Sequence, residues 1–255
     1  MNLSALDYAL WAANFLGEAV LFCILIYRRR YTEFPVFTML IGFEAVMSAV
    51  LYVIYVHCFQ AWYARIYWTY AFSDETMQLG VIWEIAWIVM RPTGTWVRDA
   101  RKQFILWGAA GILLAAALPW MVSPPAATLL HRLEVRGNLF TSLMVCELIA
   151  VVTRTSKSLG LGWRNHVMAL GNGWTAWAVV AILVDGLHSY YGAELYFREL
   201  EHVRMFAYLA ALGYWMVQFW LEEPARQPIS PELSAYIQAL HIRIKNDLDT
   251  LGARR

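Results

Sequence analysis

Residues 72–87 read FSDETMQLGVIWEIAW, and this stretch decides how the fold is interpreted. Its apolar flanks suit a lipid bilayer, yet Asp74, Glu75 and Glu84 lie within it. An ionisable side chain in the middle of a membrane costs a few kcal/mol or more, so each predicts a specific role. On one helix Asp74 and Glu84 are about 80° apart around the axis and about 15 Å apart along it, so they cannot belong to one site.

Two interpretations of this stretch stay open. In the first, one long helix carries carboxylates to an outer site and an inner site. In the second, Ser73 is an N-cap and the helix begins at Asp74, where the helix dipole stabilises the charges of Asp74 and Glu75. The second interpretation leaves Glu84 unexplained, so we predict that Glu84 is the functional acid of this segment.

The composition indicates an integral membrane protein. Of the 255 residues, 60% are hydrophobic and 15% are charged, whereas a soluble domain usually has about a quarter charged residues. The net charge of +1 gives no reason to expect a nucleic-acid partner. The three cysteines are irregularly spaced, so they predict neither a disulfide framework nor a zinc motif.

The apolar segments predict an all-α fold, a bundle of seven transmembrane helices. The spans are expected at 5–27, 34–56, 66–90, 103–122, 134–153, 165–189 and 200–221. Loops on one side contain ten Lys and Arg residues and loops on the other side contain three. The positive-inside rule therefore predicts a multi-pass inner-membrane protein with its N-terminus outside and its C-terminus in the cytoplasm. We expect Gly171 and Gly173 to permit close helix packing.

The chain divides into a transmembrane domain, residues 1–222, and a cytoplasmic tail, residues 223–255. Prolines separate the two, and apolar residues then recur at spacings of three and four, which predicts an amphipathic helix over 231–251. This helix either lies on the inner membrane surface or pairs with a partner protein or a second copy of the chain.

An outer polar pocket is predicted where the sixth and seventh spans meet. Asp185 and His188 are three residues apart, as are Glu199 and His202, so each pair shares a helix face. The predicted pocket for a small polar ligand comprises Asp74, Asp185, His188, Glu199, His202 and Arg204. The alternative is a metal site made of Asp185, His188, Glu199 and His202, which needs further carboxylates such as Glu75 and Glu134.

A second polar group is predicted at the cytoplasmic side. Glu84 and Glu147 lie at similar depth in their spans, and Arg164 and His166 open the sixth span at that depth. The four residues could form an ion-pair latch, or a proton or metal site. Alternatively, Arg164 is only a topology signal and His166 a hydrated residue at a helix end.

Glu18 and Glu44 lie near the middle of the first two spans. They either share a proton or simply hold helices together, and we favour the helix contacts. The three lysines, Lys102, Lys157 and Lys245, all lie outside the predicted spans, so no retinal Schiff base is expected. No HExxH, GxSxG or P-loop motif is present, and no cofactor is predicted.

The chain resembles a group of bacterial seven-helix inner-membrane proteins with no established activity. The likeness rests on Arg28-Arg29-Arg30 followed by Phe34-Pro35, on Trp83-Glu84-Ile85, on Leu161-Gly162-Trp163-Arg164-Asn165-His166-Val167, and on the proline-broken amphipathic tail. The resemblance implies an architecture and supplies no mechanism.

Three functions are compatible with these features. The first is a sensor or receptor, in which the outer pocket binds a ligand, the latch responds and the tail signals to a partner. The second is a non-catalytic subunit of a larger membrane complex, and the third is a metal-dependent membrane enzyme. The first uses all the predicted features, and metal analysis or copurification of a partner would distinguish the others.

Overall fold

A computed structural model describes residues 4–57, 60–90, 98–121, 129–159, 165–191 and 196–222. These ranges contain seven α-helices and one short 3₁₀ helix, and no strand. The helices are α1 (Ala5–Tyr27), α2 (Pro35–His57), α3 (Gln60–Met90), α4 (Arg98–Met121), α5 (Leu129–Leu159), α6 (Asn165–Tyr191) and α7 (Phe197–Trp220), with η1 (Arg30–Thr32) between α1 and α2. The predicted all-helical fold is confirmed, and the predicted tail helix over 231–251 lies outside the described residues.

The start of α1 follows from its first residues, SALD. The Ser4 hydroxyl accepts a hydrogen bond from the Asp7 backbone N–H at 3.2 Å, and the Asp7 carboxylate accepts one from the Ser4 N–H at 2.6 Å. This reciprocal capping box satisfies two backbone donors that the first helical turn would otherwise leave unpaired.

The stretch 72–87 lies inside one continuous helix. Helix α3 begins at Gln60 and runs for 31 residues, so the interpretation that the helix begins at Asp74 is wrong. The Ser73 hydroxyl donates to the Thr69 carbonyl at 2.7 Å, one turn back within the helix, and does not cap a helix start. The carboxylates of this stretch therefore project from a single helix to different neighbours.

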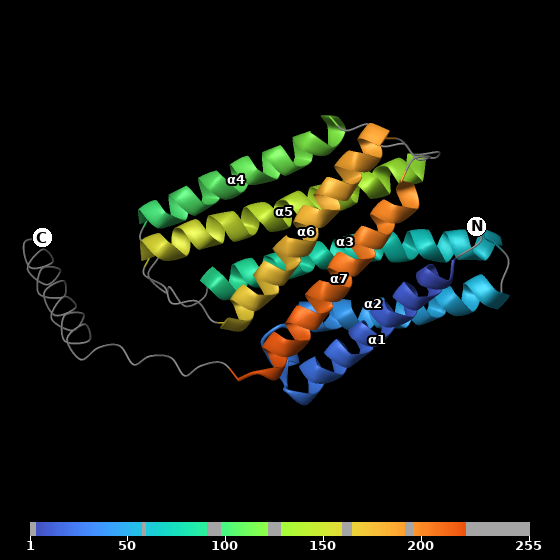
Figure 1. The fold of residues 1–255 in the computed structure, drawn as a ribbon. Helices are drawn as coiled ribbons and strands as arrows, with labels where there is room; N and C mark the ends of the chain where they lie inside the picture. The colour runs from blue at the N-terminus through green and yellow to red at the C-terminus, as the bar shows by residue number, and fades with distance from the viewer. Residues whose placement is uncertain are drawn as a thin grey trace, which may run out of the picture. The chain divides into compact units, whose positions relative to one another are not determined.

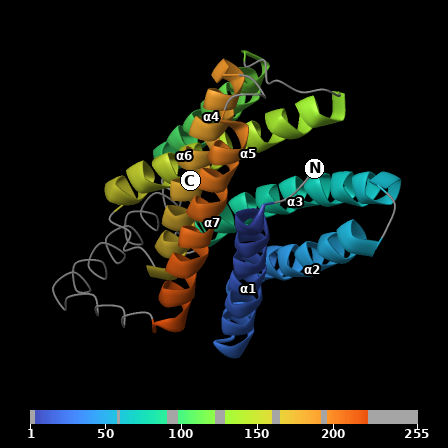
Figure 2. The ribbon, with the colours of Figure 1, turned by 45° about the vertical axis from the view of Figure 1, so that its right-hand side comes forward.

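Helices that follow one another in the chain run in opposite directions (Figure 1). Helices α1, α3, α5 and α7 begin at one end of the bundle, here called the N-side, and finish at the opposite end, the C-side (Figure 2). Helix α7 packs against α6 and α1, α2 packs against α1 and α3, and α5 packs against α3, α4 and α6. Contact between α3 and α5 closes a ring of six helices, and α4 packs on the outside of α5.

The core of this ring is aromatic and tightly packed. Phe37, Trp174, Trp215 and Phe219 are buried together. A Cβ atom at Gly173 would collide with the Trp215 ring, so this glycine lets α6 and α7 approach closely. The expectation that Gly173 permits close packing is confirmed.

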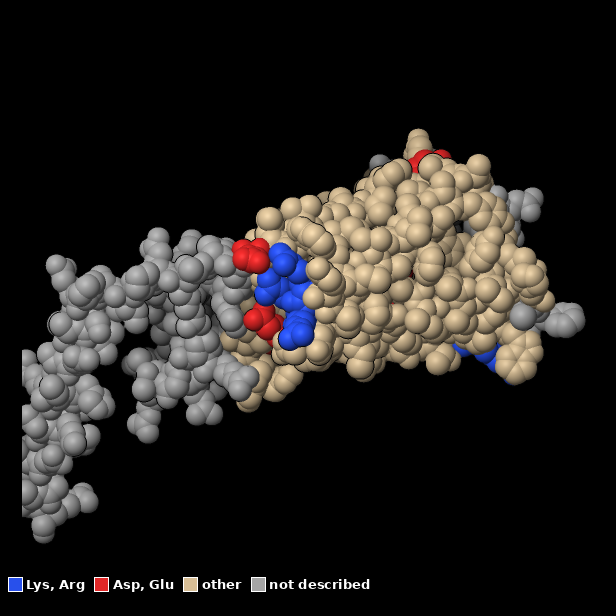
Figure 3. Space-filling view, turned by 90° about the horizontal axis from the view of Figure 1, so that it is seen from below, with Lys and Arg blue, Asp and Glu red and all other residues tan. Residues whose placement is uncertain are grey.

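The surface is also typical of a membrane protein. Large apolar side chains are exposed along the helices, including Val46 at 62%, Trp83 at 66% and Leu113 at 71%. On the face in Figure 3, Lys, Arg, Asp and Glu gather near the two ends and the middle carries none. Within the described ranges, three helical segments are long and apolar enough to cross a bilayer: α1, α2 and residues 166–188 of α6.

Candidate functional site: an acidic cavity between the helices

A cavity of about 290 Å³ lies among the helices of the ring. Of the described residues that line it, six carry carboxyl groups: Glu18, Glu44, Asp74, Glu75, Glu134 and Glu201. Arg204 is the single Lys, Arg or His side chain among the described lining residues. Because the carboxyls come from α1, α2, α3, α5 and α7, the fold itself gathers them into what we call the N-side cavity.

Tyr208 of α7 contacts one of these acids directly. Its hydroxyl donates to the carboxyl of Glu44 on α2 in a short hydrogen bond. Glu18 of α1 and Asp74 of α3 line the same cavity, so three further helices bring carboxyl groups to the cavity that Tyr208 also lines.

A pair of acids lies between α3 and α5. The Tyr67 hydroxyl donates to the Glu134 carboxylate at 2.6 Å. Glu75 lies beside Glu134, against the backbone of Gly137. A Cβ atom at position 137 would collide with the Glu75 carboxyl, so the glycine makes room for this acid.

Among the described lining residues, five buried oxygen atoms and one nitrogen have no hydrogen-bond partner in the structure: Asn14 Oδ1, Glu18 Oε2, Asp74 Oδ1, Glu75 Oε1, Gln78 Oε1 and Arg204 Nε. Glu18 is 6% exposed and Gln78 is 5% exposed. The Gln78 amide is oriented by its Nε2, which donates to Asp74 at 2.8 Å. Buried polar atoms are nearly always paired, so a group of unpaired acceptors in one cavity calls for a bound partner.

The predicted outer-pocket residues separate into two groups. Arg204 binds Asp185 at 2.5 Å and Glu201 at 3.2 Å, and His188 lies 3.7 Å from Glu201. These residues form a network at the N-side, and Arg204 and Glu201 also line the cavity. Asp74 lines the cavity too, so Arg204 and Asp74 are the predicted pocket residues that reach it.

The other two predicted residues lie elsewhere. The His202 ring nitrogen contacts the Asp7 carboxylate of α1 at 2.6 Å, and Glu199 is exposed at the start of α7. Across the described ranges, no group of three His, Cys, Asp or Glu side chains is placed to hold a metal ion. Of the four residues of the metal alternative, Asp185 and His188 lie near each other. His202 and Glu199 do not join them.

The Glu84 side chain, which projects from α3, contacts the start of α2. Its two carboxylate oxygens accept hydrogen bonds from the backbone N–H groups of Val36 at 2.8 Å and Phe37 at 3.0 Å. A carboxylate at this position satisfies unpaired donors and interacts favourably with the helix dipole. Proline is common at the first position of a helix, so Pro35 was the sequence signal for a helix start. The backbone N–H groups of the next two residues have no partner within the helix and need one from elsewhere.

The remaining members of the predicted latch have different neighbours. The Glu147 carboxyl lies against Gly111 of α4. His166 Nε2 is 3.1 Å from the Leu221 carbonyl oxygen, and its ring stacks on Phe219 at 5.5 Å between centroids. Arg164 lies outside the described residues, so its pairing with Glu84 or Glu147 stays a prediction.

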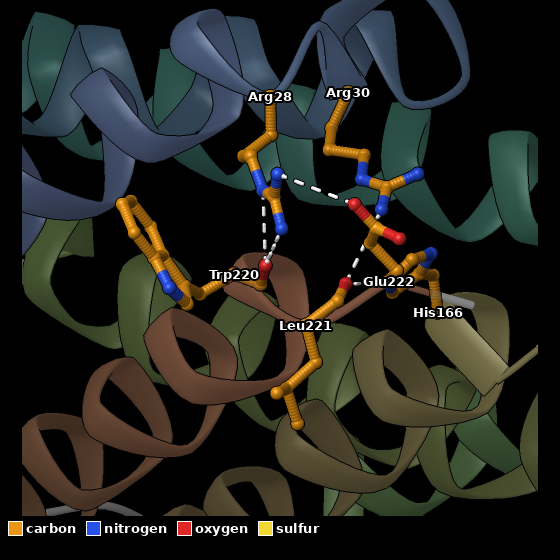
Figure 4. Close-up of polar contacts among 6 residues, drawn as sticks. All are labelled: Arg28, Arg30, His166, Trp220, Leu221 and Glu222. Atoms are coloured by element: carbon orange, nitrogen blue, oxygen red, sulfur yellow. Dashed lines mark hydrogen bonds and ion pairs between the residues drawn. The ribbon is translucent and has the colours of Figure 1, made fainter. Parts of the chain in front are cut away.

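Two arginines meet the end of α7 at the same place. Arg28 Nε donates to the Trp220 carbonyl at 2.9 Å, and Arg30 donates to the Leu221 carbonyl at 3.3 Å (Figure 4). We call this group, with His166 and Glu222, the C-side junction. It joins the α1–α2 connection and the start of α6 to the end of α7.

Comparisons of the chain with protein-family models, with curated proteins and with solved structures find no match. The likeness to bacterial seven-helix proteins therefore stays a prediction, and the function is argued from the site alone.

Proposed function

We propose that the chain is a seven-span membrane receptor that binds a small polar ligand in the N-side cavity. Seven membrane crossings are supported by the lengths of the helices, between 23 and 31 residues each, because about 20 residues cross a bilayer. The positive-inside rule, applied to the basic loops, supports an N-side that faces away from the cytoplasm.

The observation that carries the proposal is the set of unpaired acceptors on Asn14, Glu18, Asp74, Glu75 and Gln78. In a helix bundle, polar side chains normally hold helices together by binding one another. These five oxygens leave that capacity unused and line a single cavity, an arrangement that supports ligand binding.

Helix α7 supplies the route by which binding reaches the opposite side. It contributes Glu201, Arg204 and Tyr208 to the cavity and ends at the carbonyls held by Arg28 and Arg30. A tilt or shift of α7 on binding would change the C-side junction, where the chain continues towards residues 231–251. A partner protein would then read this change through that segment.

Ligand binding is tested by thermal unfolding of the reconstituted full chain against a panel of small polar molecules. We expect a molecule that raises the unfolding midpoint, with the shift lost in Asp74→Asn. The matched control is Glu199→Gln, which makes a similar neutralising change at an exposed site outside the cavity. A panel without any Asp74-dependent shift would contradict the proposal.

Signalling is tested by hydrogen exchange of the same protein with and without the bound molecule. The receptor proposal expects altered exchange in residues 28–34 and at the end of α7. Binding that leaves both segments unchanged would instead favour a non-catalytic subunit, and native copurification would then identify a stoichiometric partner.

Topology is tested by reporter fusions. A reporter after Arg255 should read cytoplasmic and one before Met1 should read periplasmic. Reporters on the same side would require an even number of spans and would overturn the seven-span proposal.

A further inference from the structure

The N-side cavity has the charge and chemistry of a site for a positively charged ligand. Building on the receptor function proposed above, we infer that the ligand is a small organic molecule with a primary ammonium group. The inference rests on the balance of charge in the cavity, on the unpaired oxygens and on the aromatic walls.

The carboxyl groups of the cavity far outnumber its cations. The positive charge of Arg204 is already matched by Asp185 and Glu201. Within the described residues, no ion pair joins Glu18, Asp74 or Glu75 to a Lys, Arg or His side chain. Buried acids without a cation repel one another and attract a positively charged ligand, whereas an anion would be excluded.

Five of the six unpaired buried atoms of the described lining are oxygen acceptors, on Asn14, Glu18, Asp74, Glu75 and Gln78, and the sixth is the Arg204 Nε donor. An ammonium group carries three hydrogen-bond donors and no acceptor, so it satisfies oxygen acceptors without adding a lone pair of its own. A hydroxyl group of a neutral ligand donates once and brings two lone pairs towards the carboxylates. A quaternary ammonium brings no N–H donor at all.

Aromatic rings form much of the remaining wall of the cavity. The described lining residues of this kind are Phe37, Tyr67, Tyr70, Trp174, Trp177, Tyr208 and Trp215. Such rings attract cations by their negative faces and pack against an alkyl chain, so they favour an organic cation over a hydrated inorganic ion. A volume of about 290 Å³ is at the small end of ligand pockets and limits the ligand to a short chain.

The test uses the full chain in discs of zwitterionic lipid, with 1,4-diaminobutane as the probe and 1,4-butanediol as its neutral counterpart. We expect the diamine to raise the unfolding midpoint and the diol to leave it unchanged. Glu18→Gln and Asp74→Asn should each weaken binding by about tenfold or more, and Glu199→Gln should leave it unchanged.

The outcomes separate the inference from the receptor proposal. A diol that binds as well as the diamine, with the same dependence on Asp74, would overturn the ammonium inference and leave the receptor function standing. Equal stabilisation by tetramethylammonium or potassium would also overturn it. If neither these probes nor any other small polar molecule binds in an Asp74-dependent way, both proposals fall.

Discussion

The N-side cavity and the C-side junction hold their charged side chains in opposite ways. At the C-side, Arg28 and Arg30 donate to the backbone carbonyls of Trp220 and Leu221. At the N-side, carboxyl groups face one another and leave oxygens without partners, as at Glu18. At the C-side junction the two arginines already bind helix-end carbonyls, although Arg30 Nε has no partner. At the N-side cavity, five buried oxygens are without a partner and would gain hydrogen bonds when a ligand is added.

Backbone dipoles explain the C-side arrangement. The last carbonyls of a helix have no partner within the helix and carry partial negative charge. Arg28 stacks over Trp220, 5.3 Å from the ring centroid, and this contact places its guanidinium against those carbonyls. Within the described residues, no comparable backbone group neutralises Glu18, Asp74 or Glu75. Neutralising an acid of this group should therefore stabilise the unliganded protein, whereas removing a C-side arginine should destabilise it.

The largest effect is expected from Arg204→Ala. It leaves Asp185, whose side chain is 3% exposed, and Glu201 without their cation. Stranding a buried carboxylate should lower the free energy of unfolding by about 3 kcal/mol. Chemical or thermal unfolding in detergent measures this, and adding Asp185→Asn should restore part of the loss. Full additivity of the two changes would show that the pair is not coupled.

Glu84→Ala should have the next largest effect. It removes the acceptor of two backbone N–H groups at the start of α2, which should cost about 2 kcal/mol. Glu84→Gln keeps one acceptor oxygen and should cost about half as much. The control is Glu147→Gln, because Glu147 Oε2 has no partner to lose. Equal effects at positions 84 and 147 would contradict the capping role.

The variant Glu84→Gln also tests the predicted latch. Each carboxylate oxygen of Glu84 accepts one backbone hydrogen bond and keeps a second lone pair, so these contacts are compatible with the predicted pairing with Arg164. Additive effects of Glu84→Gln and Arg164→Ala would contradict that pairing. A coupling energy above about 0.5 kcal/mol in the double-mutant cycle would instead establish their pairing.

Arg28→Ala should have a moderate effect, about 1 kcal/mol, because the helix-end interaction lies near the surface. Its neighbour Arg29 is the control, since Arg29→Ala removes the same charge from the same turn. Thermal unfolding of both variants decides the matter. A larger loss at Arg29 would show that net charge, and not the contact with Trp220, stabilises the junction.

The smallest effect should have the opposite sign. Glu75→Gln relieves repulsion with Glu134 and Asp74, so we expect the unliganded protein to gain about 0.5 kcal/mol while binding weakens. The comparison of the two sides predicts that a substitution raises stability and weakens binding only at the N-side. Destabilisation by Glu75→Gln would mean that its carboxyl already has a structural partner.

The helices were predictable from the sequence and their neighbours were not. Apolar runs of sufficient length located α1 within the predicted 5–27 and α2 within one residue of the predicted 34–56, because burial in lipid demands continuous apolar segments. The start of α3 was less clear, because Ser73 suits either a cap or a helix interior. Its hydroxyl bonds back to Thr69, an option that sequence alone does not distinguish.

The sequence identified polar residues of the candidate site, but it did not predict which helices bring them together. The sequence placed Asp74, Glu18 and Arg204 among polar residues inside spans, and the structure brings all three to one cavity. It did not reveal that α1 packs against α7, which takes His202 to Asp7, or that Tyr208 joins Glu44. Those contacts depend on the packing order of helices distant in sequence, and periodicity within one helix carries no information about it.

The most direct test of the account is calorimetric titration of the full chain with 1,4-diaminobutane in zwitterionic lipid discs. The account predicts a saturable heat that disappears in Asp74→Asn and persists in Glu199→Gln. No saturable heat, or the same heat in both variants, would show that the acids of the N-side cavity do not form a binding site for an ammonium ligand.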